Sequence, residues 1–335
     1  MPTIHDVAAR AGVSTATVSR YLRGEKVRAA DAVRAAVAEL GYSPNAVAQS
    51  LKSGRTATIG VVVPDVTNPF FAAVAKGLEQ VCRAQSFRML LANSDEDAER
   101  EQEILADLVH RVDGMILAPA TEQDRAPLHL REAGVPVVFL DRELAGGELF
   151  DAVLVDNAGG ARAAAEHLIG LGHTRIAFIN GPVDTTPARG RREGFLAALD
   201  EAGLKPAPEH DLDGGFREDT AHQLALRLLA LPHPPTAIFT GNNLMTVGVL
   251  KALQEMRVRV PADISVVGFD DLTLGSLLRP PLTCVHRPDV EQGALAMRLL
   301  LNRIREQAPD RPRRIVLGTE LVVRESTGKP PRARR

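Results

Sequence analysis

The sequence predicts an α/β protein in two parts, a small helical domain at the N-terminus and a larger, doubly wound domain after it. Residues 1–55 show helical periodicity without a strand pattern, whereas short β-branched runs alternate with helical stretches from Thr58 onward. A chain of 335 residues also exceeds what one ordinary core encloses. We therefore expect boundaries that give the segments 1–44, 45–56, 57–326 and 327–335.

The first domain begins with two short helices. Thr3 stands three residues before Asp6, as in a capping box, and Gly12 is expected to end the helix that they begin. Ser14 is expected to cap a second helix over residues 15–22. A third helix has apolar residues at helical spacing and ends at a glycine; these are Val33, Val37, Leu40 and Gly41. Together they predict a three-helix headpiece with a helix-turn-helix, a motif that places its second helix in the DNA major groove.

Charge is distributed unevenly along the chain. Residues 1–55 hold eight Lys or Arg and four Asp or Glu, a net charge of +4, although the whole chain carries −2. A basic N-terminal segment on an acidic body is the asymmetry expected when a DNA-binding module is joined to another domain.

The run from Thr3 to Arg20 resembles the headpiece of the LacI/GalR (lactose-repressor) family. This resemblance implies a transcription regulator that binds a pseudo-palindromic double-stranded DNA operator as a homodimer. It assigns base contacts to Thr15, Ala16 and Arg20, and phosphate contacts to Ser14, Thr17 and Ser19. An arginine in this position can form a bidentate contact with guanine. The turn over residues 23–30 departs from the family, because it is shorter and lacks a Ser/Thr-rich cap before the third helix.

Residues 42–55 resemble the hinge of the same family. A helix of nine residues is too short to hold in water, so we expect it to form only against a partner. In the family that partner is the hinge of the second subunit over the DNA minor groove, where Leu51 is expected to act as a wedge between base pairs. The resemblance assigns DNA contacts in this segment to Asn45, Val47, Ala48, Leu51 and Lys52.

The body is predicted to contain parallel sheets in two lobes, with a ligand cleft between them. The expected strands are Ile59–Val63, Met89–Leu91, Met115–Leu117, Val137–Leu140, Val153–Val155, Ile176–Ile179, Ile238–Thr240 and Ser265–Val267. The expected helices include Phe70–Arg83, Glu96–His110, Gly160–Gly170 and Leu244–Glu255.

The family resemblance continues through the body to the final strand, in motifs such as Pro64–Phe71 and Val266–Asp271. It implies a two-lobed domain like the periplasmic sugar-binding proteins, with a carbohydrate-derived effector in the cleft. Aromatic rings would stack on the sugar, and Arg191 would be the charged anchor. The effector residues implied are Phe70, Phe71, Asp141, Arg142, Arg191, Phe216, Asn242 and Asp270. A neutral sugar, a sugar acid and a sugar phosphate remain open.

Several classes of protein are disfavoured. The sequence has no phosphate-binding Gly-x-x-x-x-Gly-Lys-Ser/Thr, no Gly-x-Gly-x-x-Gly after a strand and no His-Glu-x-x-His, so we expect no catalytic residues, cofactor or metal. Cys82 and Cys284 are expected to be buried apolar residues, and His173 to be structural. We find no secretory signal and no membrane span, so we expect a cytoplasmic protein with no membrane partner. The basic tail after Ser326 has no leucine heptads, which favours a dimer over a tetramer, and is expected to lack fixed structure. The alternatives are a solute-binding or sensor protein of periplasmic type and a purine-responsive, corepressor-dependent regulator.

Overall fold

The computed structural model describes residues 2–22, 24–43, 55–123, 126–145, 147–272, 274–309 and 311–331. The chain divides into two compact units, Met1–Ala57 and Thr58–Arg335. Each unit has its own hydrophobic core. The predicted hinge contacts Asn45, Val47, Ala48, Leu51 and Lys52 lie outside the described residues.

The first unit is the predicted three-helix headpiece. Its helices are α1 (Ile4–Ala11), α2 (Thr15–Leu22) and α3 (Ala30–Leu40). Their small core consists of Val7, Ala8, Val18, Val33 and Ala36. Because each helix contributes at least one of these residues, the three helices stabilise one another.

The residues that begin and end these helices are mostly those that the sequence predicted. Thr3 and Asp6 form the predicted capping box, and Gly12 and Gly41 end α1 and α3 at φ of 63° and 57°, in the left-handed region. The hydroxyl of Ser14 accepts a hydrogen bond from the Thr17 amide at 3.2 Å, which is the predicted cap of α2. Helix α3 begins without a side-chain cap, as the shortened turn before it indicated.

The second unit contains two sheets, each of six strands among the described residues, and this confirms the predicted fold class. In the first lobe all neighbours are parallel, in the order β11 (Arg314–Leu317), β5 (Asp151–Val155), β4 (Val137–Leu140), β3 (Gly114–Leu117), β1 (Thr58–Val63), β2 (Arg88–Asn93). In the second lobe the order is β12 (Glu320–Val322), β10 (Thr283–His286), β9 (Ser265–Phe269), β8 (Ala237–Thr240), β6 (Ile176–Asn180), β7 (Asp211–Asp213), and the β10–β12 pair is antiparallel.

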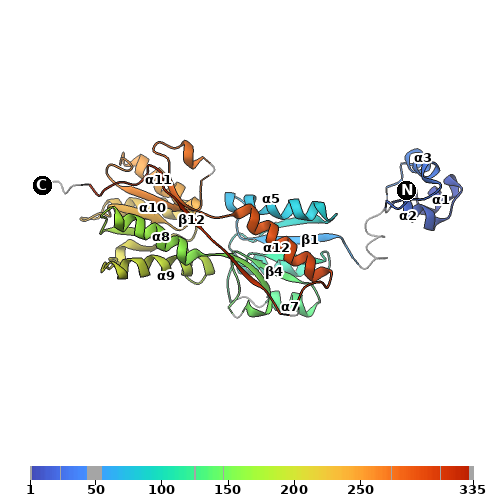
Figure 1. Cartoon of the computed structure of the whole chain (residues 1–335), viewed down its shortest axis with the longest axis horizontal. Coiled ribbons are helices and arrows are strands. Elements are labelled where there is room, and N and C mark those ends of the chain that lie inside the picture. Colours follow the sequence, from blue (N-terminus) through green and yellow to red (C-terminus); the bar gives the residue numbers. More distant parts are fainter. Residues whose placement is uncertain are drawn as a thin grey trace. The chain divides into compact units, whose positions relative to one another are not determined.

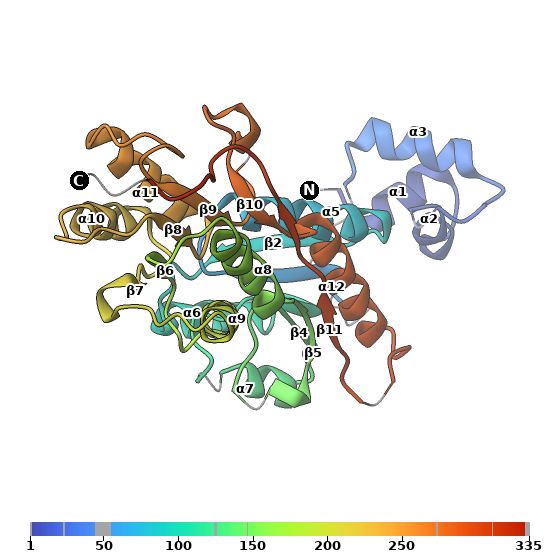
Figure 2. The same cartoon turned by 60° about the vertical axis from the view of Figure 1, so that its left-hand side comes forward.

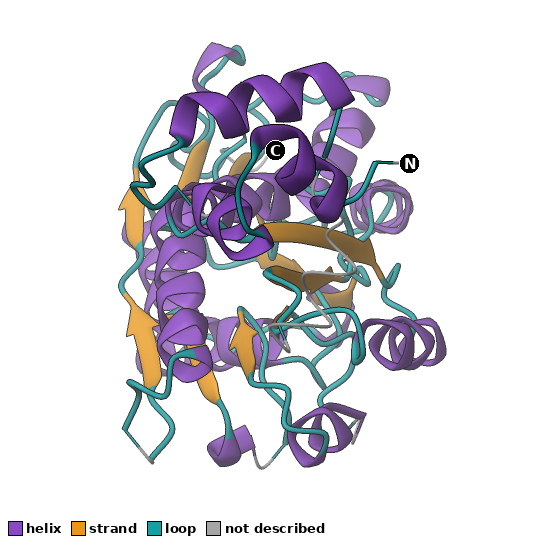
Figure 3. Ribbon diagram, turned by 90° about the vertical axis from the view of Figure 1, so that its right-hand side faces the viewer, coloured by secondary structure: helices purple, strands orange, loops and turns teal. Residues whose placement is uncertain are grey.

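Helices pack against these sheets; Figure 3 draws the helices in purple and the strands in orange. The first lobe has α5 (Pro69–Ala84), α6 (Ala98–Leu108), α7 (Ala126–Glu132) and α12 (Asp289–Ile304). The second has α8 (Asn157–Gly170), α9 (Thr186–Glu201), α10 (Glu218–Leu229) and α11 (Asn243–Glu255). Helix α8 lies beside α9, and α10 beside α11 (Figures 1 and 2). The strands β3, β4, β5, β6, β8 and β9 are buried along their whole length, as parallel strands covered on both faces must be.

Three connections cross between the lobes: β5 to α8, β10 to α12, and β11 to β12. The last of these runs as the red segment from one lobe to the other in Figure 1. The strands β7, β10, β11 and β12 do not appear among the predicted strands, because they are short and two of them, β11 and β12, are only partly apolar.

The structure corrects our expectation for the start of the C-terminal tail. We expected no fixed structure after Ser326, but His167 Nε2 contacts Thr327 Oγ1 at 2.9 Å. His173 is buried, and its Nε2 lies 2.9 Å from the Gly328 carbonyl oxygen. The tail therefore packs on the second lobe at its beginning, and His173 has the structural role that the sequence indicated.

Candidate functional site in the cleft between the lobes

The cleft lies at the carboxyl ends of the strands, where ligands bind in open α/β sheets. It is lined by Asp65, Asn68, Phe70, Phe71, Glu96, Asp141, Arg142, Pro187, Arg191, Phe216, Asn242, Asp270 and Arg287. All eight residues predicted to bind an effector are in this set, so the fold brings them together. The free cavity volume is about 20 Å³, enough for about one water molecule.

Four of the lining residues have a strained backbone, and one of them is Glu96, with φ of 58°. Asp141 directly follows β4 and has φ of 65°, Asp270 directly follows β9 and has φ of 70°, and Phe216 has φ of 57°. Residues other than glycine seldom adopt positive φ, and such strain collects at binding sites. Two of these residues, Asp141 and Asp270, are carboxylates at the ends of strands in different lobes.

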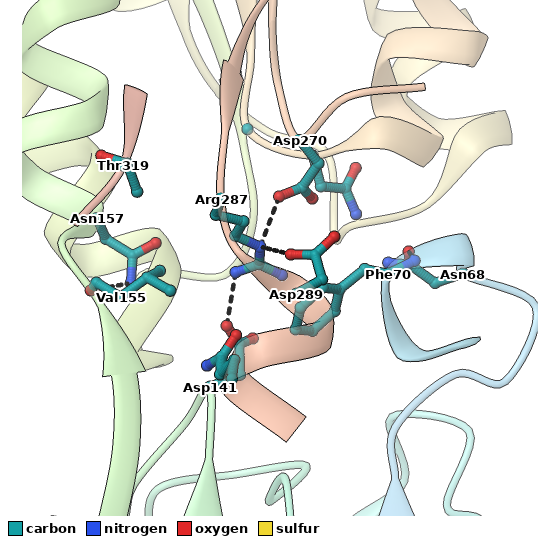
Figure 4. Close-up of polar contacts among 12 residues, drawn as sticks. Asn68, Phe70, Asp141, Val155, Asn157, Asp270, Arg287, Asp289 and Thr319 are labelled. Carbon is teal, nitrogen blue, oxygen red and sulfur yellow. Dashed lines mark hydrogen bonds and ion pairs between the residues drawn. The ribbon is translucent and has the colours of Figure 1, made fainter. Parts of the chain in front are cut away.

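Arg287 is at the centre of the cleft and was not predicted. Its Nη1 lies 2.7 Å from Asp141 Oδ1, and its Nε lies 2.9 Å from Asp270 Oδ1 and 3.2 Å from Asp289 Oδ1 (Figure 4). The Nη1 contact is also a hydrogen bond, whereas the two Nε contacts are ion pairs without hydrogen-bond geometry. The guanidinium carbon lies 3.5 Å from the centre of the Phe70 ring.

Burial and charge act in opposite directions on these carboxylates. Burial alone would raise the pKa of Asp141, but the guanidinium groups of Arg287, Arg191 and Arg142 outweigh it and hold that pKa below its usual range. Burial raises the pKa of Asp289 to about 7, assisted by the nearby carboxylates and opposed by Arg287. The single guanidinium of Arg287 therefore lies within ion-pair distance of three carboxyl groups.

A second buried ion pair joins Arg142 to Glu96. The two contacts, Nη1 to Oε2 at 2.6 Å and Nη2 to Oε1 at 2.7 Å, make the pair bidentate. The Arg142 guanidinium also lies 5.3 Å from the centre of the Phe216 ring, in the opposite lobe. Our predicted helix over 96–110 is wrong at its start, because Glu96 precedes α6 in a turn with φ of 58°. That turn directs its carboxylate to Arg142.

Arg191 extends into the cleft from α9 and is 2% exposed. Its Nε donates a hydrogen bond to Asn157 Oδ1 at 2.9 Å, and its Nη1 donates one to the Gly241 carbonyl. Among the described residues no carboxylate lies within ion-pair distance of this guanidinium. Burial lowers the pKa of Arg191 to about 10, although Asp270 raises it.

Asn242 positions other residues of the site. Its Oδ1 accepts a hydrogen bond from the Met245 amide at 2.8 Å and so caps α11. Its Nδ2 donates to the carbonyl of Phe216 at 3.3 Å. The residue therefore holds the aromatic ring of the second lobe in place as well as lining the cleft.

A further contact closes the rim of the cleft. Glu122 of the first lobe accepts hydrogen bonds from Arg189 at 2.9 and 3.1 Å, and another from the Thr186 hydroxyl. Both partners belong to α9 of the second lobe. This pair links the lobes outside the lining of the cleft.

The chemistry of the cleft is that of a binding site for a polar small molecule. At its centre Arg191 and Arg287 face Asp141 and Asp270, two positive and two negative groups. Such groups both donate and accept hydrogen bonds. Within the described part of the chain, no cluster of His, Cys, Asp or Glu has the arrangement of a metal site.

The headpiece presents the predicted recognition helix to solvent. Ser14, Ala16 and Arg20 are exposed, and Thr15, Thr17 and Ser19 are partly exposed. The hydroxyls of Ser14 and Thr17 lie 3.0 Å apart. Their contacts with DNA remain predictions.

A helix-turn-helix unit joined to a two-lobed α/β domain with a polar cleft defines a ligand-regulated DNA-binding protein. The chain matches the family of bacterial regulatory proteins of the lacI type over residues 3–45 and the periplasmic binding protein-like domain over residues 165–327. It is 40% identical to the ribose operon repressor of Escherichia coli strain K12 over 309 residues. This match covers 91% of this chain and 93% of that one. The chain belongs to the lacI family, whose members are transcription regulators and not enzymes.

Two solved structures show the same architecture. The lac repressor dimer bound to operator and the anti-inducer ONPF is 29% identical, with a TM-score of 0.86 over 98% of this chain and 99% of that one. A lacI-family regulator from Enterococcus faecium with bound ribose is 31% identical and has a TM-score of 0.73. The match covers 81% of this chain and 98% of that one. Among the described residues, no helix combines the length and apolar character needed to cross a membrane.

Proposed function

We propose that this protein represses transcription by binding a pseudo-palindromic operator as a homodimer, and that a neutral monosaccharide of the pentose class weakens that binding. The observation that carries the proposal is the central set of paired carboxylates and guanidinium groups, Asp141, Asp270, Arg191 and Arg287, in one cleft. Hydroxyl groups of a sugar donate to carboxylates and accept from guanidinium groups, so a polyol is complementary to this set.

The balance of charge supports a neutral ligand over a sugar acid or sugar phosphate. Arg142 is already neutralised by Glu96, and Arg287 by Asp141 and Asp270. A phosphate brought to Arg191 would lie close to two carboxylates, and like charges in a buried site repel strongly. The ribose named for the relatives from E. coli and E. faecium fits the same expectation.

The headpiece supports the DNA-binding half of the proposal. Arg20 is exposed on α2, and hydrogen bonds between Arg10 and Glu39 join α1 to α3. An arginine on a recognition helix reads guanine through two hydrogen bonds, while neighbouring hydroxyls and basic groups contact phosphates.

The test combines two measurements on the full chain. An operator is first selected from a random duplex library, and its affinity is measured by fluorescence anisotropy with and without each candidate effector. The candidates are D-ribose, other pentoses, hexoses, ribose 5-phosphate, a sugar acid and purine bases, and their binding is followed by calorimetry. We expect a pentose to bind and to lower operator affinity. Selective binding of ribose 5-phosphate or of a purine would contradict the effector class, and failure to select any duplex would contradict the whole proposal.

A further inference from the structure

Arg287 connects the two lobes through one side chain. It follows β10 of the second lobe, on the crossover that leads to α12 of the first. Its two closest carboxylates come from different lobes, Asp141 from the end of β4 and Asp270 from the end of β9. The guanidinium therefore bridges the cleft as a small molecule between the lobes would.

The same guanidinium covers the aromatic face that we expected a sugar to use. It lies over the Phe70 ring with its carbon 3.5 Å from the ring centre, and both side chains are almost fully buried. With Arg287 in this position the cavity holds about one water molecule, far less than a monosaccharide needs.

We propose that Arg287 is an internal ligand of the cleft and the residue that sets which effectors the cleft accepts. Its N–H groups pair with Asp141 and Asp270, and its planar face packs on Phe70, so it makes both kinds of contact that a sugar would make. The inference rests on the proposed function, because it assumes that the cleft binds a small polar effector.

An effector must then displace a cation that is already paired. Sugar hydroxyls carry no charge, so their contacts with Asp141 and Asp270 replace stronger, charge-assisted ones. Asp289 offers the displaced guanidinium a partner, since its Oδ1 already lies 3.2 Å from Arg287 Nε and its side chain is 24% exposed. A sugar able to bond both strand-end carboxylates at once is therefore selected over one that reaches a single carboxylate.

The test compares Arg287→Gln with a matched control, Arg189→Gln. Both substitutions remove an arginine that links the lobes, but Arg189 pairs with Glu122 at the rim and does not line the cleft. D-ribose affinity is measured by calorimetry, and the radius of gyration of the sugar-free proteins by small-angle X-ray scattering. We expect Arg287→Gln to bind D-ribose about tenfold more tightly, a change of about 1.4 kcal/mol, and Arg189→Gln to change the affinity less than about threefold.

Scattering separates failure of this inference from failure of the proposed function. If no sugar binds either protein, the effector class is wrong, but Arg287→Gln should still show a larger radius of gyration than the wild type. An unchanged radius would overturn the internal-ligand role, and so would ribose affinity that falls or stays the same. If Arg287→Gln does not fold, Arg287→Lys decides the matter. Lysine keeps the charge but lacks the plane that packs on Phe70, so tighter ribose binding supports the inference and equal or weaker binding contradicts it.

Discussion

Arg191 and Asn157 are joined by a hydrogen bond of 2.9 Å from Nε to Oδ1, which fixes a buried guanidinium on α9 to the first residue of α8. The Asn157 amide is itself tied to the Val155 carbonyl at 3.3 Å (Figure 4). Arg191 is thus held at the point where the chain passes from the first lobe to the second.

This arrangement predicts the effect of removing the anchor. Arg191→Ala should weaken effector binding by at least about tenfold, because the sugar loses charge-assisted hydrogen bonds worth about 1.5–3 kcal/mol. Operator affinity without effector should stay within about twofold, since the headpiece is a separate unit. Calorimetry and anisotropy with the selected operator measure the two quantities. A normal sugar titration would refute the anchor role.

The Arg142–Glu96 pair should contribute to stability through the cost of leaving one partner alone. The side chains are 4% and 23% exposed, so Glu96→Gln leaves a largely buried guanidinium without its ion-pair partner. We expect a loss of about 3 kcal/mol in the free energy of unfolding, measured by urea denaturation. Glu166→Gln, which breaks the exposed pair with Arg162, should cost less than about 1 kcal/mol. Equal losses in the two variants would show that the buried pair has no special role.

Asp289 predicts a pH dependence whose sign follows from its raised pKa. A carboxyl with a pKa of about 7 in the folded protein, against 3.8 in the unfolded chain, binds protons more tightly when folded. Its contribution to stability is therefore fully present below about pH 4 and is lost as the pH rises to about 7. Asp289→Asn should remove that dependence. The urea midpoint of the variant minus that of the wild type should therefore be larger at pH 8, where the wild type has lost this contribution, than at pH 5. Asp141 does not titrate between pH 5 and pH 8, because its pKa is lowered in the folded protein and it changes stability only at lower pH. A constant difference between the two pH values would be inconsistent with the titration of Asp289.

Arg20 should read sequence, whereas a basic residue in the following turn should contribute charge alone. Arg20→Ala is expected to cost about 1–3 kcal/mol of operator affinity and to relax the preference at one base pair. Lys26→Ala, at an exposed position, should weaken binding to all duplexes alike and reduce the salt dependence by about one counterion. Competition with single-base operator variants measures the first effect, and a salt series measures the second. If Arg20→Ala weakens all sequences equally, its contact is with phosphate.

Local sequence determined the three helices of the headpiece and eight of the twelve strands that the structure describes in the body. The capping box of Thr3 and Asp6, the left-handed Gly12 and Gly41, and the continuous apolar strands each depend on neighbouring residues, and each is present. The eight cleft residues were also predictable, because the carboxyl ends of parallel strands meet at one edge of a sheet and the family motifs mark those ends.

The pairing inside the cleft was decided only by the tertiary structure. Nothing near Arg287 in the sequence indicates that it will contact Asp141, 146 residues away, and its strand β10 was too short to be recognised. One signal was available, because the charged Arg287 stands two residues after the short run Thr283–Val285, where a strand would end. Glu96 was misassigned because its acidic neighbours resemble a helix start, whereas the buried charge of Arg142 holds it in a turn. Local propensity acts between residues a few positions apart, but a buried charge must find its counter-charge wherever the fold places one, and here that requirement decided which groups occupy the cleft.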